Sequence, residues 1–178
     1  KLSTNSVTQP SVGRCLALLV SVVGYFALHH LQSTRARVGR WKELTVGVVF
    51  AGGTLFFVAM NGRFTSPFLM AAEAWAGLCV MNCLLIACWD RERDTAMAQY
   101  SLARRWNGME RALPVVVVFL LLLILTATRL EGRLLPIAAA IMVSLMALLE
   151  LARRSKQFSP EARHVLADVV LLTPILTL

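Results

Sequence analysis

Two carboxylates stand at the end of the longest apolar segment in the sequence. Residues 70–89 are almost entirely apolar, and they run directly into the charged residues 90–94, DRERD. A helix that continues from residue 67 to residue 94 places Asp90 and Asp94 on one face, since they are four residues apart. Hard cations such as Mg²⁺ bind carboxylate oxygens together with water and substrate phosphates. The spacing therefore predicts a site for a divalent cation and a phosphate-bearing lipid; the alternative is a charged helix end neutralised by its own arginines.

The composition places these carboxylates at a membrane surface. The chain has 178 residues, is 57% hydrophobic and has a mean hydropathy of +0.66, which is high for a soluble domain. Residues 114–128 read PVVVVFLLLLILTAT, and in lipid such a backbone must satisfy its hydrogen bonds within a helix. Cys79, Cys83 and Cys88 share one apolar segment, where they are expected to pack as small apolar side chains. The expected fold is an all-α, polytopic transmembrane helix bundle.

Six apolar segments are expected to cross the membrane: residues 14–31, 44–60, 67–89, 113–128, 134–151 and 160–178. Some segments are shorter than the roughly 20 residues that a span needs, so their flanks must contribute. For the fifth and sixth segments, buried or re-entrant helices are the alternative. We expect residues 1–178 to form one transmembrane domain. The polar start, KLSTNSVTQPS, is typical of the end of a loop, so we expect the chain to be the C-terminal part of a longer protein.

The basic residues predict an orientation for this bundle. Most of the 18 Lys and Arg residues lie between the first and second, third and fourth, and fifth and sixth segments. Basic loops stay in the cytoplasm, so we expect a multi-pass protein of the bacterial inner membrane with its Asp90/Asp94 loop in the cytoplasm. Insertion and anionic lipid headgroups account for the net charge of +8. Membrane lipids are therefore the expected partners, and nucleic acid is not.

Residues 82–102, NCLLIACWDRERDTAMAQYSL, carry a family resemblance. They resemble the second aspartate-rich motif of the UbiA-type intramembrane prenyltransferases, which ends a transmembrane helix, has two aspartates four residues apart and precedes three further spans. Residues 42–47, KELTVG, are similar to the start of the preceding span in some UbiA-like proteins. Glycine commonly follows the family's motif, and Ala98 stands near that position here. The resemblance covers most of the chain, as the C-terminal two-thirds of that fold.

The resemblance implies a site and an activity. UbiA-type enzymes hold a prenyl diphosphate through Mg²⁺ ions and transfer the prenyl chain to an acceptor. Asp90 and Asp94 would be metal ligands, and Asn82, about two turns deeper, would line the lipid cavity. Arg104 and Arg105 could bind the diphosphate, because guanidinium matches phosphate geometry; their alternative role is in membrane orientation.

The family's first aspartate-rich motif is absent from these 178 residues. One carboxylate pair is a poor site for two cations and a diphosphate, so we assign no catalytic residue and expect this chain alone to be inactive. The alternative function is a non-catalytic scaffold, or a pigment- or lipid-binding subunit, in a larger complex with other membrane proteins.

Three more polar residues lie within expected spans. Glu73 is roughly 26 Å from Asp90 along the helix, so it is expected to be solvated or hydrogen-bonded near the opposite interface. His164 and Asp168 are four residues apart, and they are expected to pair with each other or with Arg163. A proton-transfer or ligand-binding role is the alternative for this pair, since intramembrane ionisable groups are often functional.

Overall fold

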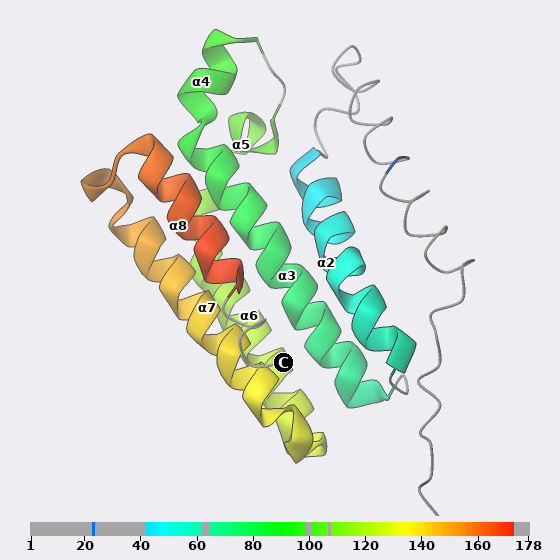
Figure 1. The fold of residues 1–178 in the computed structure, drawn as a ribbon. Coiled ribbons are helices and arrows are strands. Elements are labelled where there is room, and N and C mark those ends of the chain that lie inside the picture. The colour runs from blue at the N-terminus through cyan, green and yellow to red at the C-terminus, as the bar shows by residue number, and fades with distance from the viewer. Residues whose placement is uncertain (1–22, 24–41, 62–64, 99–100, 107, 173–178) are drawn as a thin grey trace, which may run out of the picture.

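The computed structural model describes residue 23 and residues 42–61, 65–98, 101–106 and 108–172 (Figure 1). These residues form helices and the turns between them, with no strand among them, which confirms the all-α class. In chain order the elements are α2 (Lys42–Asn61), α3 (Ser66–Trp89), α4 (Arg91–Ala96), α5 (Leu102–Arg105), α6 (Met109–Leu130), η2 (Gly132–Leu134), α7 (Leu135–Arg153), η3 (Ser155–Gln157) and α8 (Pro160–Leu172).

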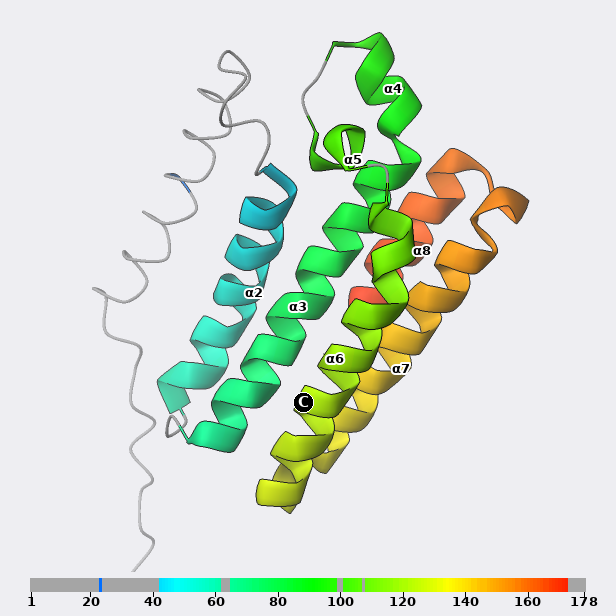
Figure 2. The ribbon, with the colours of Figure 1, turned by 180° about the vertical axis from the view of Figure 1, so that it is seen from behind.

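Helix α3 is the centre of the bundle. It contacts α2, α6, α7 and α8, and the two opposite views show α2 on one side of it and the other three helices on the other side (Figures 1 and 2). Its buried Leu78 and Leu85 belong to one apolar core with Ile124 of α6 and with Ile141 and Leu145 of α7. The side chains of α3 therefore face neighbours on several sides, as those of a central helix must.

Helices α2 and α3 approach each other closely through a small residue. A Cβ atom added to Gly47 would lie 2.6 Å from the Cα atom of Val80, so only glycine fits there. Ala51, one turn further along α2, is fully buried. Small residues of this kind let helices approach closely in membranes. The Trp75 indole N–H also donates a 2.7 Å hydrogen bond to the Thr54 hydroxyl, which links the same two helices.

The expected continuous helix from residue 67 to residue 94 is wrong. Helix α3 starts at a side-chain cap, where the Thr65 hydroxyl accepts a hydrogen bond from the backbone N–H of Phe68, and it ends at Trp89. Asp90 has a ψ of 2°, outside the helical region, and the short α4 begins after it. The backbone N–H of Asp94 still donates to the carbonyl of Asp90 at 2.8 Å, so the chain bends at Asp90 without a long loop.

Three helices are long and apolar enough to cross a membrane: Ser66–Trp89, Arg111–Leu130 and Gly132–Arg153. They agree with the third, fourth and fifth expected segments. The described part of the sixth is α8, whose 13 residues extend about 20 Å, less than a hydrocarbon core of about 30 Å. The second has a shorter apolar stretch, Glu43–Thr54, within the described side chains, and the first, residues 14–31, lies outside the described residues. Six spans are thus more than the described residues show.

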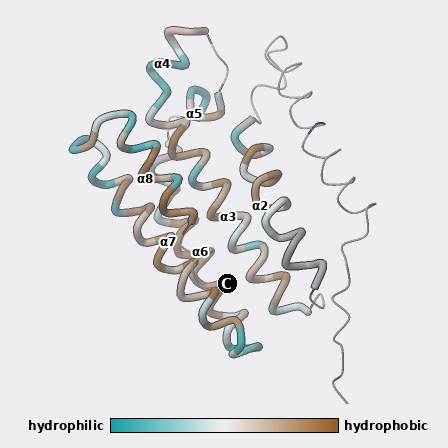
Figure 3. Tube along the Cα trace, in the orientation of Figure 1, coloured by the Kyte–Doolittle hydropathy of each residue, from teal (hydrophilic) through white to brown (hydrophobic). Residues whose placement is uncertain are grey.

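The outward face of α6 is suited to lipid. Val115, Val118, Phe119 and Leu122 are between 56% and 70% exposed. The trace coloured by hydropathy shows that apolar residues recur along the helices between the two ends of the bundle (Figure 3). A contiguous apolar face of this kind is rare on soluble proteins. The exposed face and the length of the helices together indicate a membrane protein.

Candidate functional site

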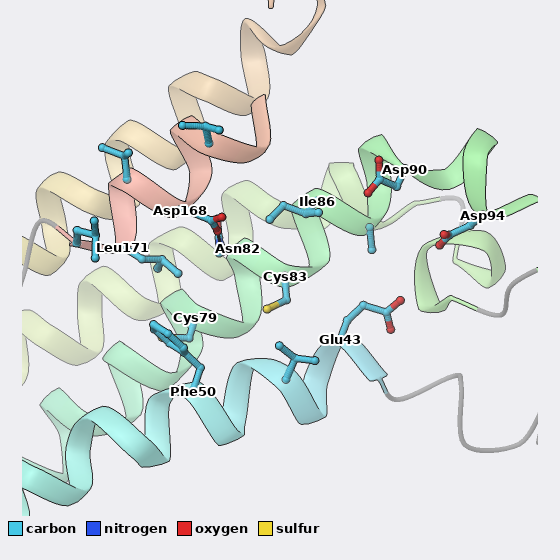
Figure 4. Close-up of a pocket in the computed structure, with 15 residues that line it drawn as sticks. Glu43, Phe50, Cys79, Asn82, Cys83, Ile86, Asp90, Asp94, Asp168 and Leu171 are labelled. Carbon is cyan, nitrogen blue, oxygen red and sulfur yellow. Dashed lines mark hydrogen bonds between the residues drawn. The ribbon is translucent and has the colours of Figure 1, made fainter. Parts of the chain in front are cut away.

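A cavity of about 750 Å³ lies between α2, α3 and α8. Its polar lining consists of four carboxylate side chains, one amide and two thiols, and aliphatic and aromatic side chains complete the wall. Figure 4 shows the carboxylates of Glu43, Asp90 and Asp94 toward one end of the cavity and Phe50 and Leu171 toward the other. The cavity therefore has a polar end and an apolar end, with the polar end at the junction of α3 and α4.

Asp90 is held by the first turns of α8. Its carboxylate Oδ1 lies 3.2 Å from Nε2 of His164, and the two side chains are 29% and 31% exposed. The His164 ring also stacks on Trp89, with ring centroids 6.5 Å apart and an interplanar angle of 14°. The guanidinium of Arg163 lies 5.7 Å from the centre of the same tryptophan ring. These contacts join the start of α8 to the end of α3.

Asp168 contacts α3 deeper in the cavity. Asn82 is 2% exposed, and its Nδ2 donates a hydrogen bond of 3.5 Å to Oδ1 of Asp168. The expected pairing of His164 with Asp168 or Arg163 is therefore wrong, because each side chain meets α3 instead. Residues on one helix face neighbouring helices as well as each other, and here the neighbouring helix supplies the partners.

The amide oxygen of Asn82 accepts no hydrogen bond from the part of the chain that the structure describes. Leaving a buried acceptor without a donor costs about 1–3 kcal/mol. Asn82 lines the cavity, so a ligand there could supply the donor. This amide is the clearest sign that the cavity is built to receive a polar group.

Glu43 is a lining residue that the sequence analysis did not assign to the site. It lies in the first turn of α2 and is 4% exposed, while Asp94 is 6% exposed. Both residues interact with other groups of the chain. The signal that could have found Glu43 is its place at the start of an expected span, on the same side of the membrane as Asp90.

The remaining residues of interest lie away from the cavity. Arg104 and Arg105 are exposed on α5, and neither lines the cavity. Glu73 is exposed on the opposite half of α3 from Asp90. The structure thus brings Asn82, Asp90, Asp94 and Asp168 together and leaves the two arginines and Glu73 outside.

The geometry at Asp90 and Asp94 does not form a metal centre from protein atoms alone. Within residues 42–61, 65–98, 101–106 and 108–172, no three His, Cys, Asp or Glu side chains are grouped to hold a metal ion. Asp90 faces His164, and the Asp94 carboxylate lies apart from it beyond the bend (Figure 4). Asp90 and Asp94 both line the cavity without a third such ligand grouped with both of them in the described residues. The expected Mg²⁺ site stays a prediction, and we derive no chemical step through that ion.

We compared the chain with protein-family models, with curated proteins and with solved structures, and found no match in any of them.

Proposed function

We propose that this chain is a multi-pass membrane protein that binds an amphiphilic molecule in the cavity between α2, α3 and α8, as a non-catalytic lipid- or pigment-binding component of a larger membrane complex. The observation that carries the proposal is the order of chemistry along the cavity. Carboxylates lie at one end, Asn82 and Asp168 lie between, and apolar side chains line the other end (Figure 4). An amphiphile has the same order of chemistry, with a polar head and an apolar tail.

The polar head of such a ligand contributes more to specific binding than its apolar tail. A tail that moves from lipid into an apolar cavity leaves one apolar environment for another, so the hydrophobic effect adds little. Binding sites gain specificity from a few placed polar groups. The carboxylates and the Asn82 amide are those groups here.

We further propose that the α4–α5 end of the bundle faces the cytoplasm, in a bacterial inner membrane. Figure 1 shows α4, α5 and the start of α8 at this end. The basic residues Arg104 and Arg105 follow α4, and Arg153 and Arg154 precede α8. The excess of basic residues supports a cytoplasmic position.

Photo-crosslinking tests the binding proposal. The chain is placed in phosphatidylcholine nanodiscs with a dodecanol probe that carries a diazirine at the end of its tail, and crosslinked residues are mapped by mass spectrometry. We expect crosslinks on the cavity-facing residues of α2, α3 and α8, and we expect excess dodecanol to remove them. Crosslinks to the outer face of α6 should persist, because that face meets bulk lipid.

Two valines of similar exposure give a matched pair for the same experiment. Val169 lines the cavity and is 52% exposed, while Val118 on α6 is 56% exposed and lies outside it. Val169→Trp should reduce the crosslinks that dodecanol removes, and Val118→Trp should leave them unchanged. If excess dodecanol removed no crosslinks at any position, the proposed binding site would be contradicted.

We propose prenyl transfer as a second candidate function, because Asn82, Asp90 and Asp94 line one cavity and are the residues to which the UbiA-type resemblance assigns roles. We expect no transfer by the 178-residue chain, which lacks the first aspartate-rich motif. The test is an assay with radiolabelled farnesyl diphosphate, MgCl₂ and an aromatic acid acceptor. Product formation that disappears in the Asp90→Ala/Asp94→Ala chain would overturn the non-catalytic proposal.

A further inference from the structure

The charge of the cavity wall selects for one kind of ligand head. Glu43, Asp90, Asp94 and Asp168 are lining residues, and no lysine or arginine is among the lining residues that the structure describes. Like charges repel strongly where water is scarce. A free anionic head, such as a phosphate or a carboxylate, is therefore a poor match for this wall.

Three of the four acidic residues interact with other groups of the chain. Asp90 lies against His164, and Glu43 and Asp94 interact with other groups of the chain. Within the described residues, the Asp168 carboxylate accepts one long hydrogen bond, of 3.5 Å from Asn82, and a carboxylate can accept several. Asp168 and Asn82, in the middle of the cavity, thus offer acceptors to a ligand head.

Asn82 defines what that head must offer. Its Oδ1 atom is buried and accepts no hydrogen bond within the described residues, while its Nδ2 atom points to Asp168. The two groups therefore present acceptors: an amide oxygen and carboxylate oxygens. Their complement is a group rich in donors, and an ammonium has three donors and no acceptor.

We propose that the cavity binds an amine-bearing amphiphile, whose ammonium group lies between the Asn82 amide oxygen and the Asp168 carboxylate and whose tail extends toward Phe50 and Leu171. This inference rests on the proposed function, because it names the ligand class of the same cavity. The ammonium satisfies the buried amide oxygen and forms a charge-assisted hydrogen bond with the carboxylate, which is the stronger kind.

Competition among amphiphiles that share one tail and differ in their polar head tests the inference. Dodecylamine, dodecanol and dodecanoate each compete with the photoreactive dodecanol probe for the chain in neutral phosphatidylcholine nanodiscs. We expect dodecylamine to compete at a concentration about tenfold lower than dodecanol does, since hydrogen bonds to charged groups are roughly twice as strong as neutral ones. Dodecanoate should be the weakest competitor.

Substitutions at Asp168 and Asn82 test whether these two residues cause the preference for dodecylamine. Asp168→Asn and Asn82→Leu should each remove most of the tenfold advantage of dodecylamine, while dodecanol still competes, which shows that the cavity is intact. Glu92→Gln is the matched control, because Glu92 is an exposed acid of α4 outside the cavity lining. It should keep the advantage in full.

The outcomes separate the two proposals. If no amphiphile competes, the binding function itself fails. If dodecanol or dodecanoate competes as well as dodecylamine, the cavity binds amphiphiles and the amine assignment alone is wrong. The amine assignment is also wrong if Glu92→Gln abolishes the preference for dodecylamine as Asp168→Asn does. It is wrong as well if MgCl₂ alone displaces the probe from the unmodified chain and does not displace it from the Asp90→Ala/Asp94→Ala chain.

Discussion

Ala98 has a φ of 52°, in the left-handed region where the Cβ of an L-residue crowds the next carbonyl. That region costs roughly 1–2 kcal/mol for residues other than glycine. Ala98 follows α4 at the point where the chain turns toward α5, and it stands near the position where UbiA-type proteins commonly have glycine. The backbone strain at Ala98 can therefore be tested by a single substitution.

Replacing Ala98 with glycine should leave the thermal unfolding temperature in detergent unchanged or raise it. The relief of the left-handed strain exceeds or balances the cost of glycine's extra freedom in the unfolded chain, about 0.5–1 kcal/mol. Ala96→Gly is the matched control, since Ala96 is the last residue of α4 and gains no relief; it should unfold at a lower temperature. An equal fall in both variants would show that the turn at Ala98 is unstrained.

At the scale of the helices, the junction between α3 and α8 includes a contact between Asp90 and His164. The Ser144 hydroxyl of α7 also donates a 3.0 Å hydrogen bond to the backbone carbonyl of Val170 in α8. The first contact lies at the polar end of the cavity, and the second lies further along α8. Both determine where Asp168 lies relative to Asn82.

A double-mutant cycle measures the first contact. Asp90→Asn and His164→Gln should together cost less than the sum of their separate costs in free energy of unfolding, with a coupling of about 0.5–1 kcal/mol for a partly exposed pair. The cycle is measured by denaturant unfolding in micelles. Glu73→Gln combined with His164→Gln is the control and should be additive, because Glu73 lies roughly 26 Å from Asp90 along α3. Additivity in both cycles would mean that the pair contributes no stability.

The packing of α2 on α3 provides a second test at the helix scale. Gly47→Ala would place a Cβ atom 2.6 Å from the Cα and 2.9 Å from the backbone nitrogen of Val80. A backbone cannot move aside as a side chain tip can, so the helices must separate, at a cost of about 1–3 kcal/mol. We expect a clear fall in thermal unfolding temperature.

Gly52→Ala is the control for this substitution. Gly52 lies on the same helix, and a Cβ atom added there has nothing within 4 Å. Its unfolding temperature should be unchanged or higher, because alanine favours a helix over glycine by about 0.8–1 kcal/mol. If Gly47→Ala were as stable as Gly52→Ala, the close approach of the two helices would be wrong.

At the scale of the whole molecule, the bundle has two ends with different chemistry. Helices α4 and α5 lie at one end and the α6–α7 turn at η2 lies at the other (Figures 1 and 2). The apolar helices between the ends indicate a membrane protein, and the basic residues favour the α4–α5 end as cytoplasmic. This orientation decides which side of the membrane the polar end of the cavity faces.

Cysteine labelling in intact cells tests the orientation. In a chain whose four native cysteines are replaced, a membrane-impermeant maleimide should label Gly132→Cys and should not label Met97→Cys until the cells are opened. Both positions are exposed, so access alone does not separate them. The reverse result would invert the orientation, and labelling of both from outside would contradict a crossing between them.

The sequence determined the helical class and three of the helices without help from the fold. Residues 67–89, 113–128 and 134–151 correspond to α3, α6 and α7 with small differences at the ends. The reason is local: long apolar runs must satisfy their backbones internally in lipid, and the break at Glu131 and Gly132 separates two of them. Length and composition are enough for such elements.

The tertiary structure decided which residues line the cavity together. Helical spacing shows which residues of one helix share a face, and it cannot show which helix packs there. Asp168 meets Asn82 and His164 meets Asp90 because α8 packs on α3, and Glu43 joins them because α2 starts beside the end of α3. The bend at Asp90 likewise separates two carboxylates that a straight helix would have aligned. A site formed by three helices depends on contacts between residues far apart in the chain, and those contacts exist only in the folded bundle.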